Sequence, residues 1–152
     1  INILSTHRNW LSRIPKRCIL TPHLGELERL IGKCMDTYER LTKVKELAAY
    51  LQSYIIVKGA WTCIVTPEGN YYFNPTGNPG MATGGSGDVL TGILLGLLAQ
   101  GYEREDACRL GVYVHGLAGN LAAAEKTEIG MTANDIIEAL PKAWKTLTTK
   151  NS

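Results

Sequence analysis

The amino-acid sequence predicts an α/β fold, in which layers of helices cover a small β-sheet. Short β-branched segments alternate with helical segments in the first half, and helical segments dominate the second half. A loop rich in Gly, Pro and Asn, at residues 74–88, separates the two. We count about four strand-like segments, of which two or three fit a main sheet. The sheet is therefore expected to be incomplete.

The first elements follow from local patterns. Residues 1–17 are expected to form a helix and a turn that lead into a strand at residues 18–21. Thr21 can cap a short helix, and Pro22 suits the first turn of that helix. A longer helix is expected over residues 36–52. Its apolar stripe consists of Leu41, Val44, Ala48 and Leu51.

The next elements are predicted to be strands. Residues 54–58 and 62–66 are short, apolar and rich in β-branched side chains, which is typical of strands. Turn-forming residues at 67–70 predict a hairpin, with residues 71–73 as its return strand.

The second half is predicted to be helical. A helix over residues 89–100 is apolar nearly all round, so we expect it to be buried. Gly92 and Gly96 would allow another element to approach that helix closely. Two further helices are expected, over residues 104–126 and 134–147, the second capped by Thr132 or Asn134 and bent or divided by Pro141.

Length, charge and cysteines limit the class of function. The 152 residues suit one domain, expected to span residues 1–152. With 16 basic and 14 acidic residues the net charge is +2, which argues against nucleic acid as a partner. No apolar run is long enough to span a bilayer, so no membrane partner is expected. Four cysteines without a CxxC pair favour reduced thiols in a cytoplasmic protein. The chain starts with Ile1, which indicates a processed protein or a piece of a longer one.

The loop from Asn74 to Asp88 carries the most chemical information. It leads into a helix, whose first N–H groups lack intrahelical partners and whose positive end attracts anions. Glycines let several N–H groups converge on a phosphate. The loop is neither a Walker A motif nor a GxGxxG fingerprint. Asp88 is predicted to act as a base for a hydroxyl that attacks phosphorus; alternatively, Asp88 only complements the helix dipole.

Two weaker signals lie at the ends of predicted strands, where ligands bind in open α/β sheets. His23 and Glu26 stand three positions apart after the first strand. Lys58 and Gly59 stand at the end of the strand predicted for residues 54–58, where a glycine lets a ligand approach the backbone. By itself, the first pair is better explained as a surface histidine and a first-turn acid, and the signal from Lys58 and Gly59 is weak.

Together these segments resemble the ribokinase-like superfamily, and within it the ADP/ATP-dependent NAD(P)H-hydrate dehydratases. The resemblance is carried by NPTGNPGMATGGSGD from Asn74, TPHLGE from Thr21 and VKGAWT from Val57. It extends through LGVYVHGLAGNLAA from Leu110 and TANDIIEALPKA from Thr132. The superfamily's sugar and vitamin kinases usually carry TPN-x-x-E, where this chain has His23.

The resemblance implies a role for each matching position. Asp88 would contact the hydrate and act as the base, His23 would line the hydrate site, and Glu26 would help to organise Mg²⁺ and phosphate. No residue is expected to bind a metal directly. The nucleotide would be held by Lys58, Gly59, Ala60, Trp61 and Thr62 and, at its phosphates, by Gly84, Gly85, Ser86 and Gly87.

The resemblance also implies a reaction and an architecture. ATP or ADP, with Mg²⁺, would phosphorylate the ring hydroxyl of NAD(P)H hydrate, and loss of phosphate would restore NAD(P)H. The fold would be a ribokinase-like three-layer sandwich, truncated to its C-terminal half, and exposed sheet edges would favour a homo-oligomer. Two alternatives stay open: a small-molecule kinase of the same superfamily, and a nucleotide-binding fragment without catalysis.

Overall fold

The computed structural model describes residues 8–59 and 61–149. Contacts divide the chain into two compact units, residues 1–73 and residues 74–152, and each is described by itself. Within the described residues, no helix combines the length and apolar character needed to cross a membrane. The single domain expected over residues 1–152 stays a prediction.

The first unit contains one four-stranded sheet, whose strands lie in the order β1-β2-β3-β4. Strands β1 (Ile19–Leu20) and β2 (Tyr54–Val57) run parallel, whereas β3 (Cys63–Val65) and β4 (Tyr71–Phe73) complete an antiparallel meander with β2. The predicted strands are confirmed, but all four join one sheet, not two or three. The reason is that the short β1 pairs in register with β2, Ile19 opposite Tyr54 and Leu20 opposite Ile55.

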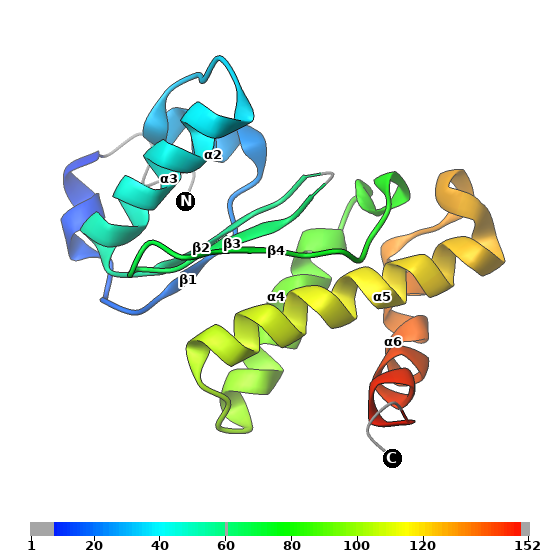
Figure 1. Ribbon diagram of the computed structural model, residues 1–152. Coiled ribbons are helices and arrows are strands. Elements are labelled where there is room, and N and C mark those ends of the chain that lie inside the picture. The colour runs from blue at the N-terminus through cyan, green and yellow to red at the C-terminus, as the bar shows by residue number, and fades with distance from the viewer. Residues whose placement is uncertain (1–7, 60, 150–152) are drawn as a thin grey trace. The chain divides into compact units, whose positions relative to one another are not determined.

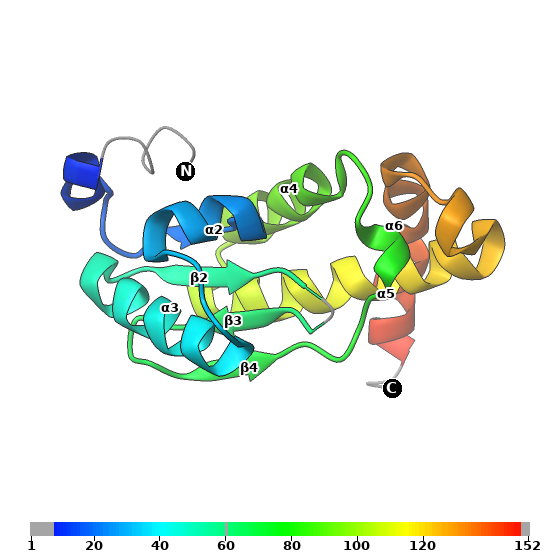
Figure 2. The same ribbon diagram turned by 90° about the horizontal axis from the view of Figure 1, so that it is seen from above.

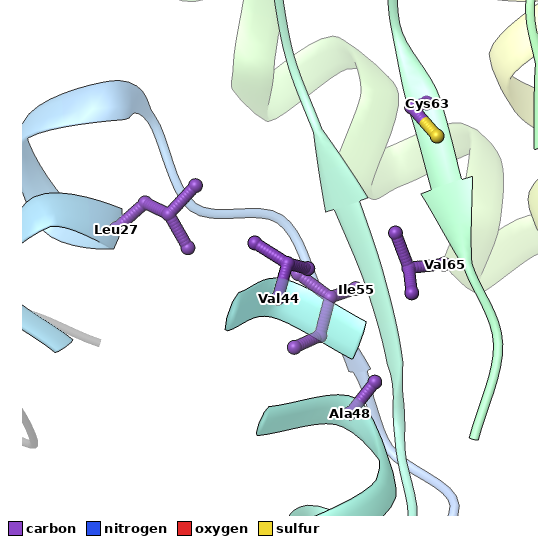
Figure 3. Close-up of a cluster of buried hydrophobic side chains, with 6 residues drawn as sticks. All are labelled: Leu27, Val44, Ala48, Ile55, Cys63 and Val65. Atoms are coloured by element: carbon purple, nitrogen blue, oxygen red, sulfur yellow. The ribbon is translucent and has the colours of Figure 1, made fainter. Parts of the chain in front are cut away.

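Two α-helices lie on one face of this sheet (Figure 1). They are α2 (Leu24–Ile31) and α3 (Thr37–Leu51), and a short 3₁₀ helix, η1 (Arg8–Arg13), precedes β1. Asp36 caps α3 by accepting a hydrogen bond from Glu39 N at 2.8 Å. The predicted apolar stripe of α3 packs onto the sheet because its side chains recur at helical spacing. Figure 3 shows the resulting core, made of Leu27, Val44, Ala48, Ile55, Cys63 and Val65.

The second unit is helical and is organised around α5 (Arg104–Gly130). Helices α4 (Ser86–Ala99) and α6 (Ala133–Thr149) pack against it, as does a 3₁₀ turn, η2 (Pro79–Met81) (Figure 2). The core of this unit consists of Val114, Ala118, Ala122, Met131, Ile136 and Ala143. A second small cluster joins α4 to α5 through Ile93, Leu97 and Ala107.

Helix α4 differs from its prediction in two ways. It begins at Ser86 rather than at residue 89, so the last residues of the predicted loop form its first turn. It is also not buried all round: Leu95 is 61% exposed, and Gly92 and Gly96 have no atoms near them beyond their own helix. Apolar composition identified the helix, but packing covers only one of its faces.

The close approaches instead involve glycines of α5. A Cβ atom at Gly111 would lie 2.9 Å from the Leu94 side chain of α4. The predicted helix 104–126 is confirmed, because the backbone leaves the helical conformation at Thr127, where φ is 67° and ψ is 161°. The residues of α5 after this kink form a separate helical turn that ends at Gly130. Helix α6 runs on through Pro141 rather than dividing there.

Helix α6 begins with a reciprocal cap. Thr132 Oγ1 accepts from Asp135 N at 3.4 Å, and Asp135 Oδ2 accepts from Thr132 N at 2.8 Å. The prediction of Thr132 as a cap is therefore confirmed. The hydrogen bonds from Thr132 hold the pKa of Asp135 below its usual value.

This cap predicts an acid-sensitive contribution to stability. A carboxyl group whose pKa is lowered in the folded state stabilises the protein above the unfolded pKa, about 3.9 for Asp. That contribution is lost as the pH falls through the lower, folded pKa. The melting temperature of the wild-type chain should therefore fall more steeply below about pH 4 than that of Asp135→Asn. Parallel curves for the two proteins would contradict the prediction.

The four cysteines are free thiols, as expected, and fall into two pairs by accessibility. Burial raises the pKa of Cys63 to about 11 and that of Cys108 to about 12.

These raised pKa values predict the reactivity of the thiols. Only the thiolate reacts quickly, so Cys63 and Cys108 should resist labelling at pH 8. We expect Cys18 and Cys34 to react with a thiol reagent in the native protein, and Cys63 and Cys108 to react only in denaturant. Rapid labelling of all four thiols in the folded chain would contradict this.

Candidate functional site

The glycine-rich loop is anchored to the middle of α5 by polar side chains. The buried Asn74 side chain donates to Thr76 O at 3.0 Å and to Val112 O at 3.4 Å. Thr76 Oγ1 donates to Tyr113 O at 2.9 Å. Further along the loop, the Asn78 side chain donates to Asn120 Oδ1 at 3.0 Å. The loop is therefore held against one face of α5.

Glycines allow this close contact. A Cβ atom at Gly116 would overlap Thr76, including its backbone carbonyl carbon, and one at Gly119 would overlap the Met81 side chain. On the loop, a Cβ atom at Gly80 would overlap the backbone of Glu128. Gly116 and Gly119 were not among the residues predicted for the site. The available signal was the segment VHGLAGN, in which two glycines stand three positions apart and so lie on one face of a helix.

The loop ends at Gly85, the N-cap of α4. Gly85 has a φ of 89°, a conformation that side chains disfavour, and no side chain caps the helix. The Ser86 N–H donates to Thr83 O at 3.2 Å. No acceptor within the described residues takes the N–H of Gly87 or of Asp88. These two donors are therefore available to an anion.

A second helix begins beside the same glycine. A Cβ atom at Gly85 would lie 3.1 Å from the Cβ atom of Ala133, the first residue of α6. The amino-terminal ends of α4 and α6 thus meet at Gly85. Each helix places partial positive charge at its N-terminus. The meeting of the two ends depends on tertiary packing, and at the α6 end the Asp135 carboxylate already accepts from Thr132 N.

Asp88 is the third residue of α4, and its side chain is exposed. Within the described residues its carboxylate makes no hydrogen bond or ion pair. Its place in the first turn suits both predictions, a base beside an anion site and a dipole-complementing acid. Gly84, Gly85, Ser86 and Gly87 lie immediately before it, so the predicted phosphate-binding residues and Asp88 form one contiguous group.

Ser86 is held by a residue for which the sequence analysis assigned no role. His115 of α5 places Nε2 at 3.0 Å from Ser86 O and 3.3 Å from Ser86 Oγ. The two residues are 29 positions apart, so no local pattern connects them.

In the first unit, His23 and Glu26 cap α2. His23 Nδ1 accepts from Glu26 N at 3.2 Å, and Glu26 Oε2 accepts from His23 N at 3.1 Å. His23 Nε2 also lies 3.2 Å from Glu26 Oε1. The prediction of Thr21 as the cap is therefore wrong: the helix begins two residues later, where the His23 ring takes the place of a capping hydroxyl. The roles in substrate and Mg²⁺ binding that the resemblance implied for His23 and Glu26 stay predictions.

The segment that follows β2, which includes Lys58 and Gly59, leaves the sheet at the same edge as the segment that follows β1. Because β1 and β2 are parallel, the segments that follow them emerge at one edge. Lys58 and Thr62 are partly buried, Gly59 is exposed, and the Trp61 side chain is 70% exposed. Ala60 lies outside the described residues. The edge therefore presents a cation and an accessible aromatic ring.

The donor groups suit Mg²⁺ only in a phosphate-bound form. Across residues 8–59 and 61–149, no three His, Cys, Asp or Glu side chains gather as they would around a metal ion. Mg²⁺ characteristically keeps several waters and takes one or two carboxylates together with phosphate oxygens. In the first unit Glu26 offers one carboxylate, both of whose oxygens already contact His23. In the second unit Asp88 offers one exposed carboxylate. Each of these by itself suits a hydrated ion carried by a nucleotide, not a protein cage.

Comparison with solved structures defines the class of fold. A ribokinase-like superfamily protein from Enterococcus faecalis matches the chain with a TM-score of 0.77 at 34% identity, over 95% of this chain and 49% of its own. The predicted α/β, ribokinase-like class is confirmed. The family model of the NAD(P)H-hydrate dehydratases matches residues 1–142. The chain belongs to the NAD(P)H-hydrate dehydratase family, as the resemblance had implied.

Two relatives illustrate the similarity within the family. The crystal structure of the ADP/ATP-dependent NAD(P)H-hydrate dehydratase of Bacillus subtilis, co-crystallised with ATP and Mg²⁺, is 39% identical with a TM-score of 0.78. The match covers 87% of this chain and 50% of the Bacillus subtilis chain. A bifunctional NAD(P)H-hydrate repair enzyme of Thermofilum pendens is 48% identical over 131 residues, 85% of this chain and 25% of its own. The chain spans half or less of the length of these relatives.

Proposed function

We propose that this chain takes part in the ATP- or ADP-dependent dehydration of (S)-NAD(P)H hydrate to NAD(P)H, a repair of the nicotinamide cofactor. The observation that carries the proposal is the first turn of α4. There, the Asp88 carboxylate stands beside the N–H groups of Gly87 and Asp88, which have no acceptor among the described residues. A base and an anion site in one helical turn suit phosphoryl transfer to a hydroxyl.

In the proposed reaction, Asp88 accepts the proton of the ring hydroxyl of the hydrate. The hydroxyl oxygen then forms a bond to the terminal phosphorus of the nucleotide, whose bond to the bridging oxygen breaks. The N–H groups at the start of α4 donate to the phosphate oxygens as negative charge develops there. The C–O bond of the phosphorylated hydrate breaks next, assisted by the ring-nitrogen lone pair, and phosphate leaves. The adjacent ring carbon then loses a proton to solvent, its C–H electron pair forms the C=C bond, and NAD(P)H results.

The residues at the sheet edge of the first unit would bind the rest of the reactants. Lys58, Gly59, Ala60, Trp61 and Thr62 are proposed to lie along the nucleotide, and His23 to line the hydrate site. Mg²⁺, held by phosphate oxygens with help from Glu26, would neutralise the charge of the phosphates.

A repair assay tests the proposal. Hydrated NADH, Mg²⁺ and either ATP or ADP are added to the chain, and the return of NADH absorbance is followed, with the Bacillus subtilis enzyme as positive control. Nucleotide-dependent recovery of NADH supports the proposal. A phosphorylated product that accumulates without elimination would favour the kinase alternative. Nucleotide binding without turnover would favour the non-catalytic alternative.

The assembly and location of the protein are also proposals. A homo-oligomer would bring a second copy of each helix start and sheet edge into one particle, and size-exclusion chromatography with light scattering tests it. A cytoplasmic location agrees with four free thiols.

A further inference from the structure

The hydrogen bond between His115 and Ser86 has a defined donor and a defined acceptor. Ser86 is 6% exposed, and its carbonyl oxygen lies 3.0 Å from His115 Nε2. A carbonyl oxygen can only accept, so Nε2 carries a proton and donates it. Both the neutral Nε2–H tautomer and the imidazolium have this proton. The hydrogen bond therefore forms in either charge state of the ring.

This direction excludes a serine–histidine catalytic pair. Ser86 Oγ lies 3.3 Å from the same Nε2 atom, and Ser86 stands at a helix start, as a nucleophile could. A base for the Ser86 hydroxyl would need a free lone pair on Nε2. The proton on Nε2 points to the closer carbonyl oxygen instead. His115 thus acts on the backbone of Ser86, not on its hydroxyl.

The backbone group that His115 holds includes a phosphate donor. The C=O of Ser86 and the N–H of Gly87 belong to one peptide group, which is planar and trans, so they point in opposite directions. Because Ser86 begins α4, its C=O also accepts from the Leu90 N–H one turn along the helix. The bond from Nε2 is a second donor, which further restrains this peptide group and with it the direction of the Gly87 N–H. Donation to the C=O also polarises the peptide group and strengthens the hydrogen bond that the N–H donates, by about 10–30%.

The position of His115 on α5 adds to this effect. One residue further along α5, Gly116 contacts Thr76, and Tyr113 O accepts from Thr76 Oγ1. The same turn of α5 thus holds the beginning of the loop and the first residue of α4.

We propose that His115 is a positioning residue for the anion site: its Nε2–H, through the Ser86 carbonyl, orients and polarises the Gly87 N–H toward the bound phosphate. The identity of the anion as a nucleotide phosphate rests on the proposed function. The orientation of the Gly87 N–H in the free chain does not depend on the proposed function.

Two variants separate this role from simple packing. His115→Leu keeps bulk but lacks a donor, and His115→Gln keeps an N–H₂ donor near the Nε2 position. Affinity for ATP with Mg²⁺ should fall about tenfold in His115→Leu, the loss of one hydrogen bond, and recover largely in His115→Gln. Ile136→Val, a fully buried change in the core of the same unit, is the matched control for lost stability and should leave the affinity unchanged.

An amide NMR spectrum of the ligand-free chain supplies the second measurement. The Gly87 amide resonance should shift in His115→Leu and return toward its wild-type position in His115→Gln. If the Leu variant does not fold, His115→Asn, which is polar but too short to reach Ser86 O, takes its place. A chain that shows the amide shifts but does not bind ATP would overturn the proposed function and keep the positioning role. An unchanged Gly87 resonance, or equal effects of Leu and Gln, would overturn the inference itself.

Discussion

Replacement of Asp88 by Asn is expected to lower the rate of nucleotide-dependent dehydration by roughly 10²–10⁴-fold, the usual contribution of a positioned base. Asn has nearly the same shape as Asp but cannot accept a proton from the attacking hydroxyl. The N–H groups of Gly87 and Asp88 belong to the backbone and are retained, so ATP should still bind. The measurement is NADH recovery at saturating nucleotide, with calorimetric titration of ATP and Mg²⁺ alongside.

The chain offers a matched control for this variant. Asp106 is the third residue of α5, the same helical position that Asp88 has in α4, and its side chain is also exposed. Asp106→Asn removes a comparable interaction with a helix dipole, about 0.3–1 kcal/mol. If Asp88 were only a dipole-complementing acid, the two variants would lose similar stability and both would keep activity. Equal turnover in the two variants would remove Asp88 from the mechanism.

The largest expected effect on stability comes from Gly116→Ala. The new Cβ atom would overlap Thr76, including its backbone carbonyl carbon, so the loop itself must move. Overpacking of this kind typically costs about 1–3 kcal/mol. Displacement of Thr76 would also break its hydrogen bond to Tyr113 O. We therefore expect a lower unfolding free energy in urea and weaker ATP binding in the same variant.

Gly96→Ala is the matched control, since it makes the same chemical change inside a helix. A Cβ atom at Gly96 has nothing near it beyond its own helix. Alanine there should stabilise the chain by about 0.5–1 kcal/mol through helix propensity, and ATP binding should not change. Stabilisation by both substitutions would show that the loop does not lie against α5 as described.

The helix and strand spans were predictable because their signals are local. The apolar stripe within residues 36–52 predicted α3, and the turn residues 67–70 predicted the β3–β4 hairpin. The contiguous segment from Gly84 to Asp88 predicted a candidate anion site, because a glycine-rich turn at a helix start needs no distant partner to present N–H groups.

Other features were predicted incorrectly or not at all because they depend on distant residues. Gly92 and Gly96 were expected to allow close packing, yet Gly111, Gly116 and Gly119 of α5 do so. An apolar pattern shows that a helix can be buried, but it does not show which face a neighbour will cover. His23 displaced Thr21 as the cap of α2 because its ring Nδ1 accepts from Glu26 N while its backbone N–H donates to the Glu26 carboxylate.

The sequence by itself determined the order of the elements, the glycine-rich loop at the start of α4 and the place of Asp88, since each depends on the conformational preferences of neighbouring residues. Only the tertiary structure decided what holds that loop in place. It brought His115 to Ser86, Gly116 to Thr76 and Ala133 to Gly85. These contacts join residues far apart in the chain, and helix packing against α5, rather than any local preference, determines them.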